Sequence, residues 1–124
     1  MCCLSESRYS GAGKPAPFPC YNDFMSSVSE FQKRAWDNKV KHGFNLENVE
    51  REFCLLEGEV SEAYLAWLRK EDGLGSELAD VFIYLAGIAE MNGIDLEKEI
   101  LEKMEINEKR KYKKVNGILV KDES

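Results

Sequence analysis

Proline is confined to one short stretch of this 124-residue chain, at Pro15, Pro17 and Pro19. The rest of the chain therefore lacks the residue that most strongly disrupts helices. Threonine is absent, and valine and isoleucine together number thirteen, so the chain has little of the β-branched material that sheets favour. The sequence predicts a flexible arm over residues 1–22, followed by an all-α body.

Size and charge exclude several classes of protein. A chain of 124 residues fits one domain, and its 17 basic and 23 acidic side chains leave a net charge of −6. A nucleic-acid polymer is therefore not an expected partner. The longest nearly uncharged stretch, residues 78–89, is too short to cross a bilayer, and no basic-then-apolar leader opens the chain. Four cysteines and one histidine form no zinc-ligand spacing. We expect a cytoplasmic protein with reduced thiols and no membrane segment.

Apolar spacing predicts two helices in the first half of the body. The first starts near Asn22 or Asp23 and stops at Gly43. The second follows the cap candidate Asn45, and its apolar residues recur at steps of three and four. This stripe consists of Leu46, Val49, Phe53, Leu56, Val60, Ala63 and Trp67.

Two further helices follow. Ser76 is the cap candidate of the third, which runs to Asn92-Gly93 and is apolar on nearly all sides, so it should be the central element. Asp95 caps the fourth, which should continue to about Tyr112. Its expected inward residues are Leu96, Ile100 and Met104.

The connections between these helices are short, which predicts a compact four-helix bundle. Asn116-Gly117 lies between short apolar runs and is typical of a tight hairpin turn. We therefore divide the chain into the arm, a helical domain over residues 23–114, and a C-terminal tail or short hairpin over residues 115–124.

Two pairs of acidic residues stand out on consecutive helices. Glu59 and Glu62 share one helix face, and Glu77 and Asp80 repeat the same i, i+3 spacing on the next helix. If the two helices pack antiparallel, four carboxylates converge, and protons or cations must neutralise them. A single one of these pairs is commonly just a solvated helix face, but the residues around Asp80 are all apolar. Oxygen ligands without histidine favour Mg²⁺.

A basic stripe follows on the fourth helix, where Lys103, Asn107 and Arg110 recur at steps of four and three. Cations beside a metal cluster suit a polyphosphate. The same stripe is also explained as a solvated face whose cations favour the C-terminal end of a helix.

Several segments together resemble the MazG-like all-α nucleoside triphosphate pyrophosphohydrolases. They are residues 55–63 (LLEGEVSEA), 77–81 (ELADV) and 93–97 (GIDLE), with Lys103, Asn107 and Arg110. The resemblance covers roughly residues 24–112. It implies a Mg²⁺-dependent enzyme, with Mn²⁺ as a substitute, that cleaves (deoxy)nucleoside triphosphates to monophosphate and pyrophosphate in nucleotide-pool housecleaning. It also implies a homodimer or a dimer of dimers.

By the same resemblance, Glu59, Glu62, Glu77 and Asp80 are the metal ligands and catalytic acids, and the stripe on the fourth helix contacts phosphate. Trp36 and Tyr84 are candidates for stacking on the base, although a tryptophan at such a position is often simply core. Many relatives carry a further glutamate where this chain has Gly58. That difference leaves open the number of ions and the identity of any general base.

Two other classes of protein remain to be weighed. A non-catalytic helical module that dimerises and regulates a partner fits the helices but needs no acid like Asp80 among apolar neighbours. A carboxylate-bridged di-iron bundle uses Glu-x-x-His pairs, and His42 follows no such glutamate.

Overall fold

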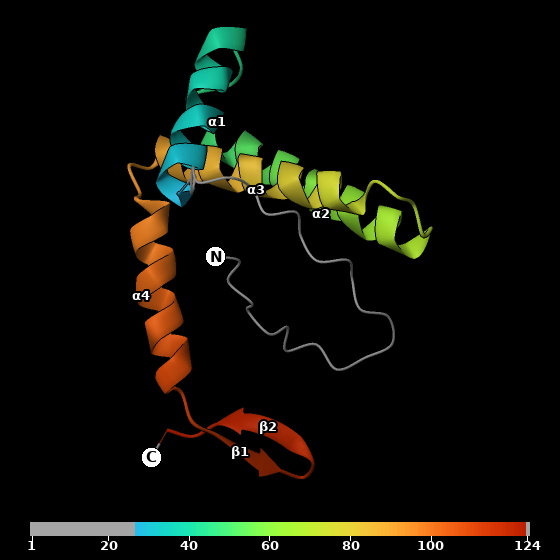
Figure 1. Cartoon of the computed structure of the whole chain (residues 1–124), viewed down its shortest axis with the longest axis vertical. Helices are drawn as coiled ribbons and strands as arrows, with labels where there is room; N and C mark the ends of the chain where they lie inside the picture. The colour runs from blue at the N-terminus through green and yellow to red at the C-terminus, as the bar shows by residue number, and fades with distance from the viewer. Residues whose placement is uncertain (1–26, 124) are drawn as a thin grey trace, which may run out of the picture.

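The computed structural model describes residues 27–123, so the arm expected over residues 1–22 lies outside the described part of the chain. The expected all-α class and the short C-terminal hairpin are both confirmed (Figure 1). The elements are α1 (Val28–His42), α2 (Val49–Leu68), α3 (Leu74–Met91), α4 (Leu96–Lys109), β1 (Tyr112–Val115) and β2 (Ile118–Lys121).

Helix α1 begins later than the sequence predicted. Ser27 has extended backbone angles, and its side chain accepts a hydrogen bond from the Glu30 amide, so it is the N-cap. The start expected near Asn22 or Asp23 is therefore wrong for this helix. Its end is as expected, because Gly43 adopts a left-handed conformation with φ of 67°.

Helix α2 is capped by Asn48, and the prediction of Asn45 is wrong. The Asn48 side chain accepts a hydrogen bond from the Arg51 amide at 2.9 Å. Asn45 lies one turn earlier and braces the loop instead, because its side-chain oxygen accepts from the Asn48 amide at 3.0 Å. Two asparagines three residues apart both suit a cap, and the backbone angles decide between them.

Helix α3 also starts before its expected cap. It begins at Leu74, so Ser76 lies within the first turn, and no side chain caps it at Gly73. The exit is as predicted, with φ of 64° at Gly93. Asp95 caps α4 as expected, because its side chain accepts a hydrogen bond from the Lys98 amide.

The C-terminal end of α4 differs from the prediction. The helix stops at Lys109 instead of near Tyr112, because Tyr112 is already the first residue of β1. Strands β1 and β2 pair antiparallel, and the turn between Val115 and Ile118 is the expected Asn116-Gly117, both with positive φ.

The helices do not form the compact bundle that the sequence predicted. Helices α2 and α3 lie side by side as an antiparallel hairpin, and α1 crosses α3 (Figure 1). Helix α4 packs against α1 only near its start and then runs away from the hairpin, carrying the two strands with it. Among residues 27–123, none of the helices combines the length and apolar character that crossing a membrane requires.

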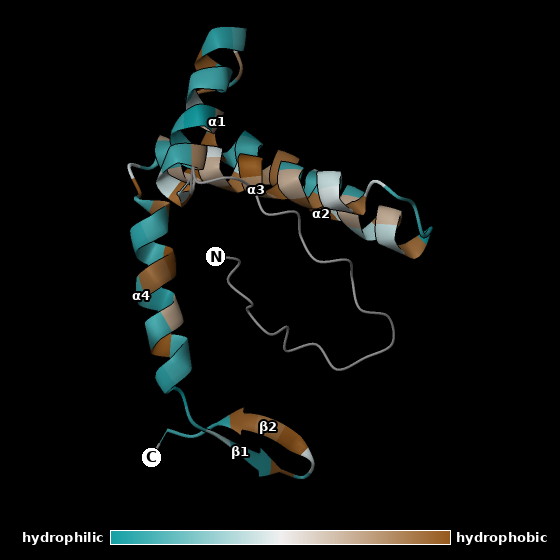
Figure 2. Cartoon of the chain, in the orientation of Figure 1, coloured by the Kyte–Doolittle hydropathy of each residue, from teal (hydrophilic) through white to brown (hydrophobic). Residues whose placement is uncertain are grey.

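Small residues dominate the core where these helices meet. The buried apolar residues are Ala63, Ala66, Ala86, Ile88 and Ala89. The regular stripe on α2 does not face this core throughout, since Phe53, Val60 and Trp67 are 50, 50 and 60% exposed. Met104, expected to point inward, is 52% exposed. Apolar residues are visible along α3 and β2 in Figure 2. Within one chain, therefore, much apolar surface stays in contact with water.

A buried glutamine joins α1 to the turn between α3 and α4. The Gln32 side-chain nitrogen donates to a Glu90 carboxylate oxygen at 2.7 Å and to the Ile94 carbonyl at 2.8 Å. Its oxygen accepts from the Leu96 amide at 3.1 Å. The nitrogen and the oxygen of the buried amide are thus both hydrogen-bonded. These bonds fix the start of α4 against α1.

Candidate metal centre and adjoining pocket

The α2–α3 hairpin brings acidic side chains from both helices to one place. One carboxylate oxygen from each of Glu59, Glu77 and Asp80 lies within 4.8 Å of the other two. Opposite ligands of one Mg²⁺ are about 4 Å apart, so these three acids approach the dimensions of an ion site. Exposed acidic groups are also common where no ion binds. The geometry therefore makes this acidic cluster a candidate metal centre and does not name the ion.

Burial and the neighbouring carboxylates both act on the pKa of Glu59. Partial burial, together with the nearby charges of Glu62, Asp80 and Glu77, raises the pKa of Glu59 above its ordinary value. The pKa of Tyr84 is raised as well, first by burial and then by the charges of Glu59 and other acids. In both groups burial is the larger cause, and the surrounding carboxylates add to it.

Glu62 is the one predicted ligand that does not join the acidic cluster. Its side chain is exposed, and its carboxylate is not among the three that lie within 4.8 Å. It still contributes to the raised pKa of Glu59, so it lies close enough to act electrostatically. The i, i+3 spacing put Glu59 and Glu62 on adjacent positions of one face, but of the two only Glu59 is half-buried and within the 4.8 Å group.

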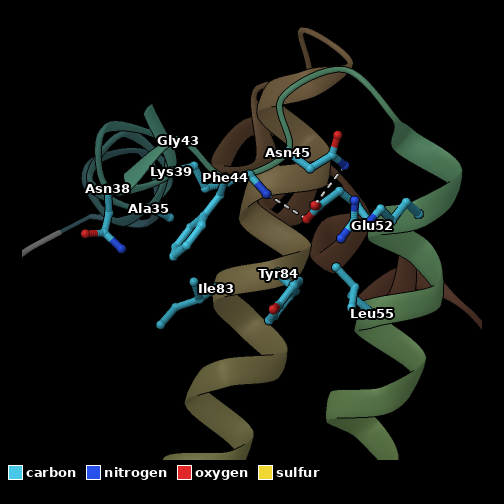
Figure 3. Close-up of a pocket in the computed structure, with 11 residues that line it drawn as sticks. Ala35, Asn38, Lys39, Gly43, Phe44, Asn45, Glu52, Leu55, Ile83 and Tyr84 are labelled. Carbon is cyan, nitrogen blue, oxygen red and sulfur yellow. Dashed lines mark hydrogen bonds and ion pairs between the residues drawn. The ribbon is translucent and has the colours of Figure 1, made fainter. Parts of the chain in front are cut away.

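A pocket of about 490 Å³ opens between α1 and the α2–α3 hairpin (Figure 3). Leu55 from α2 and Tyr84 from α3 line it, and each lies four residues from a cluster acid, Glu59 and Asp80 respectively. Four residues of helix rise about 6 Å, so the pocket and the cluster are neighbours along the same helix pair. Ile83 adds a second residue from α3. The remaining walls come from α1, the α1–α2 loop and the start of α2, through Ala35, Asn38, Lys39, Gly43, Phe44, Asn45, Arg51 and Glu52.

The inner wall of this pocket contains an ion pair that the sequence did not reveal. Lys39 Nζ donates to Glu52 Oε2 at 2.7 Å, and Asn45 Nδ2 donates to Glu52 Oε1 at 3.0 Å (Figure 3). Glu52 is 1% exposed. Glu52 lies at the edge of the apolar stripe, three residues after Val49 and four before Leu56. A charged residue at such an edge is commonly solvated, and no spacing within α2 indicates that α1 covers it.

The remaining predicted residues lie elsewhere in the single chain. Trp36 is half-buried on α1 and does not line the pocket, whereas Tyr84 does. Lys103 and Asn107 are exposed on the part of α4 that runs away from the hairpin, and Arg110 directly follows that helix (Figure 1). One chain therefore does not bring the basic stripe next to the acidic cluster.

Comparisons with known proteins do not assign this chain to a family. A scan against protein-family models, a search of curated proteins and a search of solved structures each found no match to this chain. The resemblance to the MazG-like enzymes rests on the motifs alone and stays a prediction.

Proposed function

We propose that this protein is a Mg²⁺-dependent nucleoside triphosphate pyrophosphohydrolase of the cytoplasm, in which Mn²⁺ can replace Mg²⁺. The observation that carries the proposal is the acidic cluster of Glu59, Glu77 and Asp80 beside a pocket large enough for a small ligand. Its volume of about 490 Å³ is within the usual range of ligand pockets. A polyphosphate joined to an organic group matches this combination.

The donor set of the cluster fits a hard divalent cation. All three groups are carboxylates, and accessible carboxylates leave room for water and for phosphate oxygens, as Mg²⁺ requires. When bound, Mg²⁺ would neutralise the triphosphate and lower the pKa of a coordinated water. In this proposal Glu62, which is exposed and close enough to raise the pKa of Glu59, would act on a second ion or on the attacking water.

The pocket suits the base and sugar of a nucleotide. The pocket lining offers apolar contacts from Leu55, Ile83 and Phe44. Tyr84 also lines the pocket, four residues along α3 from Asp80, so in this proposal its ring lies at the junction of the pocket and the cluster. An aromatic ring at that junction can pack on a base while the phosphates extend towards the acids. Asn38 adds an amide to the lining, which can pair with the polar edge of a base.

A second copy of the chain completes the site in this proposal. The basic stripe of Lys103, Asn107 and Arg110 belongs to α4 and the residue after it, which lead away from the α2–α3 hairpin of the same chain. The acidic cluster needs cations nearby to bind a substrate with several negative charges. Helix α4 of a partner, laid over the exposed apolar face of α2, would supply them. The assembly is then a homodimer, or a dimer of dimers, and burial of residues such as Phe53 and Trp67 would favour it.

The test is pyrophosphate release from a panel of canonical and modified nucleoside triphosphates, with and without Mg²⁺. Asp80→Asn and Glu62→Gln should abolish turnover while the fold persists. Glu57→Gln is the matched control, since Glu57 is exposed on the same helix and outside the cluster. Wild-type rates in Asp80→Asn would remove the metal assignment.

The second candidate is a non-catalytic helical module that dimerises and regulates a partner. The half-exposed stripe of Phe53, Val60 and Trp67 favours it, because such a face suits any helical partner. A stable dimer that releases no pyrophosphate from any triphosphate, in Mg²⁺ or Mn²⁺, would select this candidate.

A further inference from the structure

Three helices meet at the ion pair between Lys39 and Glu52. Lys39 is on α1 and Glu52 on α2, and their side chains are only 11 and 2% exposed. Gly87 of α3 lies next to the lysine side chain, because a Cβ added at Gly87 would be 3.3 Å from Lys39 Cδ. The three nearest atoms to that position all belong to Lys39, so the absence of a side chain at Gly87 is what lets the lysine cross α3.

The pair also forms part of the pocket. Lys39, Asn45 and Glu52 all line it, and the negative charge of Glu52 reaches Tyr84, where it contributes to the raised pKa. Asn45 holds the other Glu52 oxygen and also bonds the Asn48 carbonyl at 2.7 Å. The α1 wall, the α1–α2 loop and the α2 wall of the pocket are therefore joined at one carboxylate.

Stability alone does not account for such a pair. Taking two charges out of water offsets most of their attraction, so apolar residues of the same volume commonly hold helices together equally well. What a buried pair adds is a constraint on α1, because a shift that carries Nζ out of reach of Oε2 leaves two unpaired charges in a buried site. Apolar packing among the small side chains of this core tolerates sliding more readily.

We propose that the Lys39–Glu52 ion pair is a positioning element that fixes α1 against the α2–α3 hairpin and thereby sets the width of the pocket beside the acidic cluster. Its effect on substrate binding rests on the proposed function, whereas its effect on α1 does not. Neither residue touches the reacting phosphates in this arrangement, because the acidic cluster lies two turns further along α2.

The test removes both charges together, with Lys39→Met and Glu52→Gln in one variant, so that no unpaired charge stays buried and the protein folds. The control is Lys98→Met with Glu102→Gln, which removes an exposed pair of the same composition, 3.8 Å apart, on α4. We expect KM for the best triphosphate to rise about tenfold in the first variant with kcat nearly unchanged, and both to stay unchanged in the control. An unchanged KM in a folded first variant would overturn the proposal.

Amide hydrogen exchange separates this proposal from the proposed function. We expect exchange along α1, between Ala35 and Val40, to quicken about tenfold in the first variant while α2 and α3 keep their protection. This readout requires no substrate. If the wild type hydrolyses no triphosphate but α1 exchanges faster in the double variant, the proposed function is refuted and the positioning role of the ion pair is supported. If α1 of the double variant exchanges at the wild-type rate, the positioning role is refuted.

Discussion

Gly87→Ala tests how firmly the lysine is held across α3. In a helix interior, alanine is favoured over glycine by about 0.5 to 1 kcal/mol. The new methyl group would lie 3.3 Å from Lys39 Cδ and 3.8 Å from Cε, so the lysine must move by a few tenths of an ångström. Its amino group already donates to Glu52 at 2.7 Å in a buried site, and a charge-assisted hydrogen bond of this kind contributes about 1.5 to 3 kcal/mol.

If Lys39 is held firmly, that movement breaks its hydrogen bond to Glu52, and the loss outweighs the gain in helix propensity. We expect Gly87→Ala to lower the free energy of unfolding by about 0.5 to 2.5 kcal/mol, the difference between the two terms when the hydrogen bond is fully lost. Gly58→Ala is the matched control, because Gly58 lies inside α2 and no atom of another helix among the described residues is within 4 Å of its added Cβ. That variant should gain about 0.5 to 1 kcal/mol.

The assay is urea unfolding followed by far-UV circular dichroism, in EDTA so that ion binding near Gly58 plays no part. A third comparison repeats Gly87→Ala in a Lys39→Ala background, where the clash is gone and the substitution should become stabilising. If Gly87→Ala stabilises the otherwise wild-type protein as much as Gly58→Ala does, Lys39 yields freely and the argument for a fixed α1 is wrong.

Three further predictions concern the candidate metal centre and the assembly. Because the pKa of Glu59 is raised in the fold, the folded state holds its proton more tightly than the unfolded state, so the ion-free protein should lose stability as the pH rises from 4.5 through the raised value. Melting temperatures in EDTA should therefore fall less over this range in Glu59→Gln than in the wild type. Lys103→Ala and Asn107→Ala should each lower kcat/KM about tenfold to a hundredfold and leave the Mg²⁺-induced rise in melting temperature intact; unchanged kinetics in both would make the stripe a solvated face. Dilution should lower stability and activity together, and sedimentation of a fully active monomer at micromolar concentration would contradict the shared site.

Local spacing predicted the features that depend on neighbours in the sequence. The facing positions of Glu59 and Asp80 follow from helical periodicity and a short connection, and the Asn116-Gly117 turn follows from backbone preferences. Helix ends were less predictable where two capping residues stood close together, as Asn45 and Asn48 do.

Features that depend on contacts between helices were not predictable in this way. The burial of Glu52 requires α1 to cover it, and no pattern within α2 reports the position of α1. The apolar periodicity of α2 likewise did not distinguish the face that meets α3 from the face with Phe53 and Trp67 in water. The departure of α4 was missed for a related reason, since a short connection limits the distance between helices but not the angle.

The acidic cluster and the pocket require different numbers of helices to come together. Glu59, Glu77 and Asp80 come from one hairpin, so closing a short loop is enough to bring them together, and this step is fast and has a small entropy cost. The pocket exists only after α1 has docked and Lys39 has left water. During folding, the hairpin should therefore gather its negative charges before the ligand pocket forms, and divalent cations in the medium should accelerate hairpin formation more than the docking of α1.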